Sequence, residues 1–125
     1  MKLSVIAVDY DGTVASRDTL EPSVRDAIAA ARTNGIAVLL VTGRSLDELR
    51  RVAGDLYFVD GVVAENGALV HFPESDHTTV LAPRMSAAFV AELQRRGLAI
   101  RPGECLVDAN AADAPLILDA LRVLE

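Results

Sequence analysis

Short apolar runs alternate with amphipathic stretches in the first half of the chain. Leu3 to Val8 and Ile36 to Val41 are short apolar runs rich in β-branched residues, typical of strands buried on both faces. Between them, apolar residues recur at helical spacing after Pro22, a residue favoured at the first helical position. A second helix opens at Ser45, which forms a capping-box pair with Glu48. This alternation of strands and helices predicts parallel pairing with right-handed crossovers.

The pattern changes after residue 55. Apolar residues flank Asn66-Gly67, a dipeptide that strongly favours a β-hairpin. The elements predicted here are a short strand at 56–59, a hairpin at 62–72, a helix from Ser86, strands at 98–100 and 105–107, and a helix from about Asp113. We therefore predict an α/β fold. A Rossmann-like parallel-sheet core covers residues 1–78, and residues 79–125 form a partial small α/β domain or continue the core.

Composition narrows the class of protein. Apolar residues make up 51% of the chain, enough to bury a core, and the net charge of −6 argues against nucleic-acid or anionic membrane partners. No run approaches the ~18 apolar residues of a membrane span, and the N-terminus lacks a signal-peptide pattern. We expect a soluble cytoplasmic protein. Cys105 is the single cysteine, which excludes an intramolecular disulfide and a multi-cysteine zinc site.

Two aspartates follow the first apolar run. Asp9 closes the predicted strand, and Asp11 comes two residues later, where Gly12 permits a tight turn and Thr13 can donate a hydrogen bond. In open parallel sheets, ligands bind beyond the carboxyl ends of the strands. Such an acidic pocket can hold a divalent metal, present a nucleophilic carboxylate, or do both. The alternative for an Asp-x-Asp pair taken alone is a solvated acidic turn.

Thr42-Gly43-Arg44 follows the second apolar strand and opens the helix capped by Ser45. A hydroxyl, a flexible turn and nearby helix N-terminal amides are what a phosphate group needs. Arg44 adds a fork of charged donors for an anion. Taken in isolation the segment is an ordinary strand-to-helix turn. Its position beside the two aspartates favours an anion site.

These segments together resemble the haloacid-dehalogenase-like (HAD) hydrolases. Asp9-Tyr10-Asp11-Gly12-Thr13 is similar to the first motif of the family, and Thr42-Gly43-Arg44 to its second motif in the Cof-like, type IIB branch. Glu65-Asn66-Gly67-Ala68 resembles a hairpin frequent in that branch. The resemblance covers about residues 1 to 72, and residues 84 to 125 look like the first part of that branch's inserted α/β cap.

The resemblance implies a Mg²⁺-dependent phosphatase that acts on small phosphorylated metabolites through an aspartyl-phosphate intermediate. Asp9 would be the nucleophile and Asp11 the acid and base. Mg²⁺ would bind Asp9 and Asp11, the latter through its backbone carbonyl. The implied phosphate- and substrate-binding residues are Gly12, Thr13, Thr42, Gly43, Arg44 and Asn66. For Asn66, a purely structural role in the hairpin turn is the competing interpretation.

Two parts of the family pattern are missing from this sequence. One is a lysine that neutralises the nucleophile and the phosphate, and the one lysine here, Lys2, stands at the wrong end of the first strand. The other is a late acidic motif, for which Asp108 and Asp113 are the candidates. Either residues 84–125 are the front half of a cap, or the protein is a minimal capless hydrolase. In the capless case Asp108 completes the metal site and an arginine replaces the lysine: Arg95, Arg96 or Arg101. We favour the cap, because arginine substitutes poorly for a compact point charge.

The alternative function is a truncated or catalytically incomplete HAD module that acts as a binding or assembly domain, or as the front part of a longer protein. A core without its last strands would expose a sheet edge and apolar surface. We therefore expect a homo-oligomer. His71 and His77 are expected at the surface of the hairpin and the loop that follows it.

Overall fold

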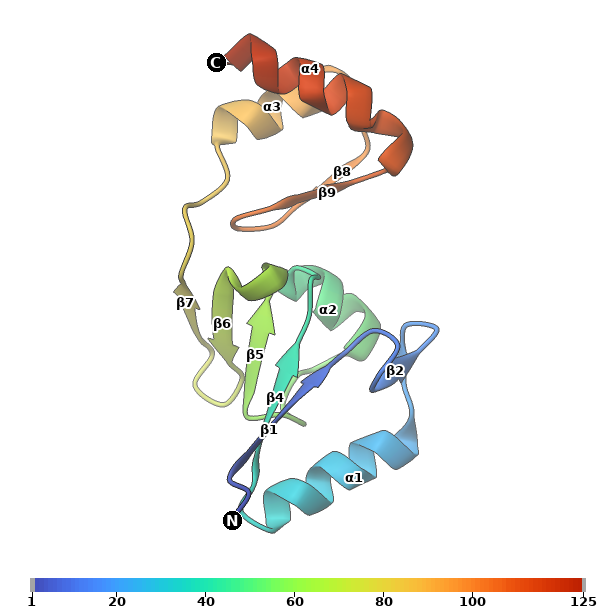
Figure 1. Ribbon diagram of the computed structural model, residues 1–125, viewed down its shortest axis with the longest axis vertical. Helices are drawn as coiled ribbons and strands as arrows, with labels where there is room; N and C mark the ends of the chain where they lie inside the picture. Colours follow the sequence, from blue (N-terminus) through green and yellow to red (C-terminus); the bar gives the residue numbers. More distant parts are fainter. Residues whose placement is uncertain (1, 125) are drawn as a thin grey trace. The chain divides into compact units, whose positions relative to one another are not determined.

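The computed structural model describes residues 2–124, which divide into a first unit that ends at Ala82 and a second that begins at Pro83 (Figure 1). The sequence placed the boundary after residue 78. The structure places it later because β7 (His77–Val80) pairs antiparallel with β6 (Leu69–Phe72) and so belongs to the first unit.

A five-stranded sheet forms the first unit, in the order β1-β4-β5-β6-β7. β1 (Val5–Asp9), β4 (Ala37–Val41) and β5 (Gly61–Ala64) run parallel, and β6 and β7 continue the sheet antiparallel. α1 (Pro22–Thr33) links β1 to β4, and α2 (Leu46–Ala53) links β4 to β5. The predicted α/β fold with a Rossmann-like core is confirmed, and the hairpin makes the sheet mixed.

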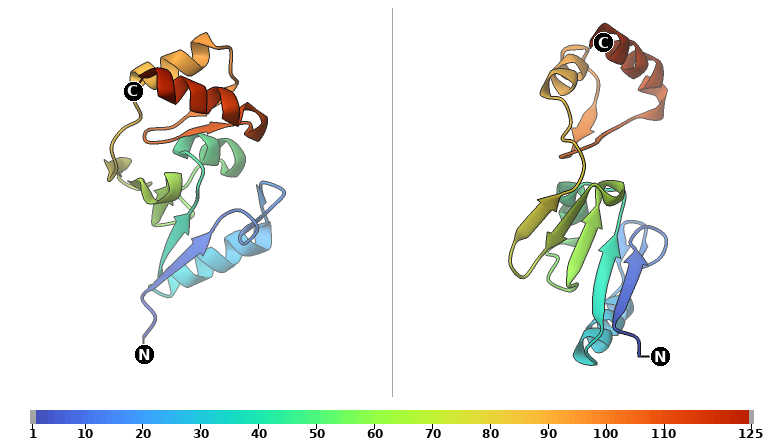
Figure 2. Two further views of the ribbon diagram at one scale, coloured as in Figure 1. Left: turned by 45° about the horizontal axis from the view of Figure 1, so that its top comes forward. Right: turned by 60° about the vertical axis from the view of Figure 1, so that its left-hand side comes forward.

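The helices cover one face of this sheet (Figure 2). Val38, Leu40 and Val62 point to that face and are buried together with Leu49 of α2. On the opposite face, Val5 remains 50% exposed, and burial alternates along β1. The prediction that the first strand is buried on both faces is therefore wrong for the described residues. An all-apolar strand sequence cannot reveal which face lacks a covering layer.

Two local predictions are also corrected. Residues 56–59 are buried at Leu56, Phe58 and Val59 but form no strand, so their apolar character reflects packing rather than pairing. The predicted hairpin is present, with Ala64 opposite Leu69, but residues 65–68 connect its strands instead of Asn-Gly alone.

The polar stretch after β1 contains a hairpin that the sequence did not predict. β2 (Ala15–Ser16) pairs antiparallel with β3 (Thr19–Leu20). The two residues between them, Arg17 and Asp18, have left-handed φ angles of 51° and 66°. Turns of this kind are usually marked by Asn-Gly or Asp-Gly, so Arg-Asp gave no signal.

The second unit has the predicted order of helix, strand, strand and helix. It comprises α3 (Ala87–Arg95), β8 (Ile100–Pro102), β9 (Val107–Ala109) and α4 (Ala114–Leu124). Leu93 of α3 and Ala120 of α4 are its fully buried side chains among the described residues. Within residues 2–124, every helix is too short or too polar to cross a membrane.

The core of the first unit yields a stability prediction. Leu40→Ala, at a fully buried site in β4, should lower the free energy of unfolding by about 2–5 kcal/mol, because it removes buried methyl groups and leaves a cavity. Leu81→Ala is the matched control, since that side chain is 63% exposed, and it should change stability by less than about 0.5 kcal/mol. Urea denaturation of both variants measures this, and equal losses would contradict the packing described.

Candidate functional site

Parallel pairing brings the ends of β1, β4 and β5 to one edge of the sheet. Asp9 lies opposite Val41, and the amide of Tyr10 donates to the carbonyl of Val41 at 3.0 Å. The amide of Thr42 donates to Val63 (2.9 Å), and that of Asn66 donates to the carbonyl of Thr42 (3.2 Å). The predicted site residues Asp9, Thr42 and Asn66 are thus brought to the same edge.

A tight turn after β1 brings Asp11 back to this edge. Gly12 has a φ of 75°, a conformation that side-chain-bearing residues rarely adopt, and its amide donates to the carbonyl of Ala15 (3.1 Å). The carbonyl of Tyr10 accepts from the amides of Val14 and Ala15, which closes the turn. Thr13 is exposed beside Gly12 in a shallow pocket that Asp11 also lines.

Thr42 and Gly43 form a compact turn between β4 and α2. The Thr42 side chain is buried, and its Oγ1 accepts a hydrogen bond from the amide of Arg44 at 3.0 Å, so its own proton remains for another acceptor. A Cβ on Gly43 would lie 2.8 Å from Oδ1 of Asn66. A larger residue at position 43 would therefore require the end of the Asn66 side chain to move. The predicted residues Thr42, Gly43 and Asn66 are in mutual contact.

Arg44 is the charged centre of the site. Its Nε donates to Asp11 Oδ2 at 3.0 Å and its Nη2 to Asp11 Oδ1 at 2.8 Å, a bidentate pair. Nη2 also donates to Asp18 Oδ1 at 2.5 Å, and Nη1 lies 3.9 Å from Glu48 Oε2. These hydrogen bonds hold the pKa of Asp11 below its ordinary value of 3.8 and raise that of Arg44. Asp11 is thus held as a carboxylate.

The Asp9 carboxylate is different. It is exposed at the end of β1, and no residue among 2–124 forms a hydrogen bond or ion pair with it. Within the same described residues, no three His, Cys, Asp or Glu side chains are gathered so as to hold a metal ion. The Asp9 carboxylate and the Asp11 backbone carbonyl remain as hard oxygen donors. Hard oxygen donors of this kind suit divalent cations such as Mg²⁺ and Ca²⁺.

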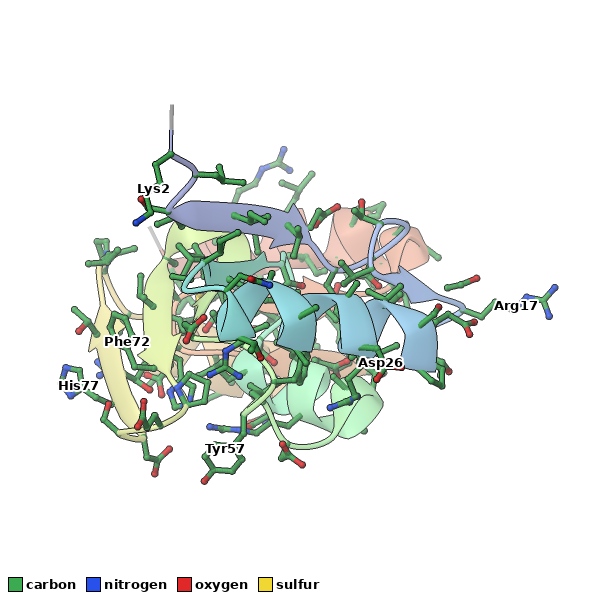
Figure 3. The ribbon with its side chains drawn as sticks, turned by 90° about the horizontal axis from the view of Figure 1, so that it is seen from below. Lys2, Arg17, Asp26, Tyr57, Phe72 and His77 are labelled. Carbon is green, nitrogen blue, oxygen red and sulfur yellow. The ribbon has the colours of Figure 1, made fainter. Side chains whose placement is uncertain are left out.

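The other charged candidates have partners elsewhere. In the second unit Asp108 pairs with Arg101 at 2.6 Å, while Arg95 and Arg96 both pair with Glu92. Lys2 is exposed just before β1, at the opposite end of that strand from Asp9 (Figure 3). The structure therefore does not bring Lys2 to the predicted site.

His71 corrects a surface prediction. Its side chain is buried, with Nδ1 at 2.8 Å from Thr78 Oγ1 and Nε2 at 3.3 Å from Arg50 Nη2. Burial, reinforced by the Arg50 charge, lowers the pKa of the ring. His71 pairs with Val62 and shares its helix-covered face, which an isolated hairpin sequence does not reveal. His77 is exposed, as predicted.

Two residues near the site were missed by sequence reasoning. Tyr10, between the two aspartates, is fully buried, and its hydroxyl donates to the backbone carbonyl of Asp18 at 2.8 Å. Asp18 then contributes its carboxylate to Arg44. The only sequence signal was an aromatic residue inside an otherwise acidic motif, and the contacts depend on the unpredicted β2–β3 hairpin.

Comparison with known proteins identifies the family. Residues 6–96 match the haloacid dehalogenase-like hydrolases. The chain therefore belongs to this family.

Among curated relatives, the phosphoglycolate phosphatase of Pyrobaculum neutrophilum is 45% identical over 80 residues, which cover 62% of this chain and 35% of that protein. The phosphatase YwpJ of Bacillus subtilis is 32% identical over 73 residues, covering 58% of this chain and 26% of that protein. The matched segments span only 26% to 35% of the length of these two relatives.

Solved structures share the fold. The Thermoplasma acidophilum protein 0175 superposes with a TM-score of 0.66 at 16% identity, over 98% of this chain and 58% of its own. The HAD subclass IIB sugar phosphatase BT4131 gives a TM-score of 0.56 at 21% identity, over 95% of this chain and 49% of its own. The predicted likeness to the type IIB branch is confirmed at the level of fold.

The Arg44–Asp11 pair predicts a pH dependence. In Arg44→Gln the pKa of Asp11 should rise toward its ordinary value, because the charged hydrogen bonds are lost. The pKa of Asp11 is lower in the folded chain than in the unfolded chain. The ion pair therefore stabilises the fold fully above pH ~4, and this stabilisation is lost as the pH falls through the folded-state pKa of Asp11. The stability difference between wild type and Arg44→Gln should therefore be full at neutral pH and vanish in acid.

Carboxyl NMR titration and denaturation at several pH values measure both effects. Arg17→Gln, which removes the same charge from the exposed hairpin tip (Figure 3), is the control. An Asp11 pKa that is equal in wild type and Arg44→Gln would contradict the assigned cause.

Proposed function

We propose that this chain carries the attacking half of a Mg²⁺-dependent phosphomonoesterase for small phosphorylated metabolites. The observation that supports the proposal most strongly is the pairing of Asp9 with Val41, which sets an unpartnered carboxylate beside the Thr42 turn. A nucleophile needs a free carboxylate, and a phosphate needs hydroxyl and amide donors next to it. The phosphatase names of its relatives agree with this reaction class.

We take the residue roles from the family resemblance and fit them to this geometry. The Asp9 carboxylate attacks phosphorus and forms an acyl phosphate, while the leaving alkoxide takes a proton from Asp11. Water then attacks the phosphorus of the acyl phosphate and gives a proton to Asp11. This hydrolysis releases phosphate and restores the Asp9 carboxylate. The Thr42 hydroxyl holds one phosphate oxygen, and Gly43 and Asn66 shape the same wall of the site.

Asp11 can donate a proton only after its ion pair with Arg44 has broken, because the bidentate pair favours the ionised carboxyl group. A bound phosphate offers Arg44 an alternative partner of higher charge. We therefore assign Arg44 to the substrate phosphate in the loaded site. Gly12 and Thr13 line the pocket next to Asp11, where the leaving group would lie.

Mg²⁺ would be held by the Asp9 carboxylate and the Asp11 backbone carbonyl, and would supply neutralisation of the phosphate charge. The Asp9 carboxylate is available for the metal because Arg44 forms its ion pairs with Asp11 and Asp18.

Residues 83–125 we assign to the front part of a cap, because their helix, strand, strand and helix form a unit of their own. In that assignment Asp108 is a structural partner of Arg101 rather than a metal ligand. The substrate of the whole protein is then a small phosphorylated metabolite recognised in part by this unit.

A second candidate function is an incomplete module that binds phosphate or assembles without turnover. Two observations favour this function. Lys2 lies just before β1 and so cannot serve as the lysine of the site. One sheet face is uncovered, and on it Val5 is 50% exposed and Phe72 is 43% exposed. Burying such a face in a second copy would stabilise both chains.

Phosphate release from a panel of phosphomonoesters, with and without Mg²⁺, tests the enzymatic proposal. Asp9→Asn should lower the rate by roughly four orders of magnitude, as expected when a nucleophile is removed. Asp26→Asn, the same change at an exposed position of α1, should leave the rate unchanged. Activity that survives Asp9→Asn would sink the nucleophile assignment.

Light scattering at micromolar concentration tests the second candidate. We expect a dimer or larger assembly that dissociates when Val5 and Phe72 are both replaced by serine, because both side chains lie on the uncovered face. A monodisperse monomer of the wild-type chain would count against assembly, and robust turnover by this chain would reject the incomplete module.

A further inference from the structure

The tip of the β2–β3 hairpin is held in an unusual conformation. Arg17 and Asp18 both have left-handed φ angles, 51° and 66°, where the two-residue turn normally carries Asn-Gly. Aspartate tolerates this region and arginine does so only with strain. Strained residues of this kind persist when the surrounding structure holds them, and they gather at functional sites.

Asp18 is tied to the site by two contacts. Its backbone carbonyl accepts from the buried hydroxyl of Tyr10 at 2.8 Å, and its carboxylate accepts from Arg44 Nη2 at 2.5 Å. Tyr10 lies between Asp9 and Asp11 in the chain, so the same motif that presents the carboxylates also anchors the hairpin tip. The tip is therefore coupled to the position of Arg44.

Arg44 has few donors left for a ligand. A guanidinium carries five N–H groups. The Nε–H and one Nη2–H bind Asp11, and the other Nη2–H is directed to Asp18. The remaining pair, on Nη1, lies 3.9 Å from Glu48, and the Arg44 side chain is only 23% exposed. Three carboxylates thus surround one cation. A phosphate that is to bind two nitrogens of the guanidinium must displace one of them, because Nε and Nη2 are both occupied.

We propose that Asp18 is a positioning residue that competes with the substrate phosphate for Arg44, so that the β2–β3 hairpin sets how tightly the site holds an anion. The inference rests on the proposed function, because it takes phosphate as the ligand of Arg44. Of the two strong partners, Asp18 is the more exposed, with 62% of its side chain accessible against 48% for Asp11. It is therefore the partner that Arg44 loses first and at the smaller cost, since exposed ion pairs are weak, and the release of Asp11 follows. Once Arg44 turns to phosphate, the tip keeps only its bond to Tyr10.

Asp18→Asn separates this role from a structural one. Asparagine has the same size and occupies left-handed turn positions readily, so the hairpin and its Tyr10 bond are retained. The charge that competes for Arg44 is removed. Inorganic phosphate, titrated by NMR in the presence of Mg²⁺, should bind about two- to fivefold more tightly to Asp18→Asn than to the wild-type chain, the range set by exposed ion pairs.

Two controls complete the test. Asp26→Asn makes the same charge change on α1 (Figure 3) and should leave phosphate affinity unchanged. In an Arg44→Gln background, Asp18→Asn should give no gain, because the group for which the two anions compete is gone. Equal affinity of wild type and Asp18→Asn, or a gain that persists without Arg44, would overturn the competition while leaving the proposed function intact. Phosphate binding by none of the chains would overturn both.

Discussion

The parallel pairing of β1 with β4 is the constraint on which the site depends. Setting Asp9 opposite Val41 fixes where the first carboxylate emerges, and it fixes Thr42 one residue beyond on the neighbouring strand. β5 then pairs with β4 and delivers Asn66 against Gly43. Three segments far apart in sequence therefore meet at one edge because backbone hydrogen bonds set the registers of β1 with β4 and of β4 with β5. In parallel sheets this edge is where ligands bind.

Electrostatics divides the two aspartates of the first motif. Arg44 takes Asp11 in a bidentate pair and holds it ionised, while Asp9 keeps its carboxylate unpaired. Arg44 thus distinguishes the two carboxylates, since it binds that of Asp11 and leaves that of Asp9 exposed. Asp18 adds a further charge to the same guanidinium and links the site to a strained hairpin. Asp9, Asp11 and Asp18 outnumber Arg44 at this site, which is the reason that the proposed function includes a metal cation beside the phosphate.

The sequence predicted the α/β fold and the cluster formed by Asp11, Thr42, Gly43 and Arg44, because these residues lie within three positions of the ends of two apolar strands. It missed Asp18, since the contact with Arg44 spans 26 positions and has no local periodicity. It also placed His71 at the surface, because a two-faced strand pattern does not reveal which face the helices cover. The exposure of one face of β1 was missed for the same reason. Apolar residues on both faces show that a strand can be buried on both sides, but they do not show whether another element covers each side.

We propose Asp9 as the phosphoryl acceptor of this chain. The most direct measurement is acid quenching of the chain during incubation with a reactive phosphoryl donor such as acetyl phosphate and Mg²⁺, followed by borohydride reduction and mass-spectrometric mapping. Borohydride reduces an aspartyl phosphate to homoserine, so the position of the homoserine identifies the aspartate that was phosphorylated. We predict homoserine at position 9 in the wild-type chain and in Asp26→Asn, and none at that position in Asp9→Asn. Homoserine at another aspartate, or donor hydrolysis that proceeds equally well in Asp9→Asn, would contradict it.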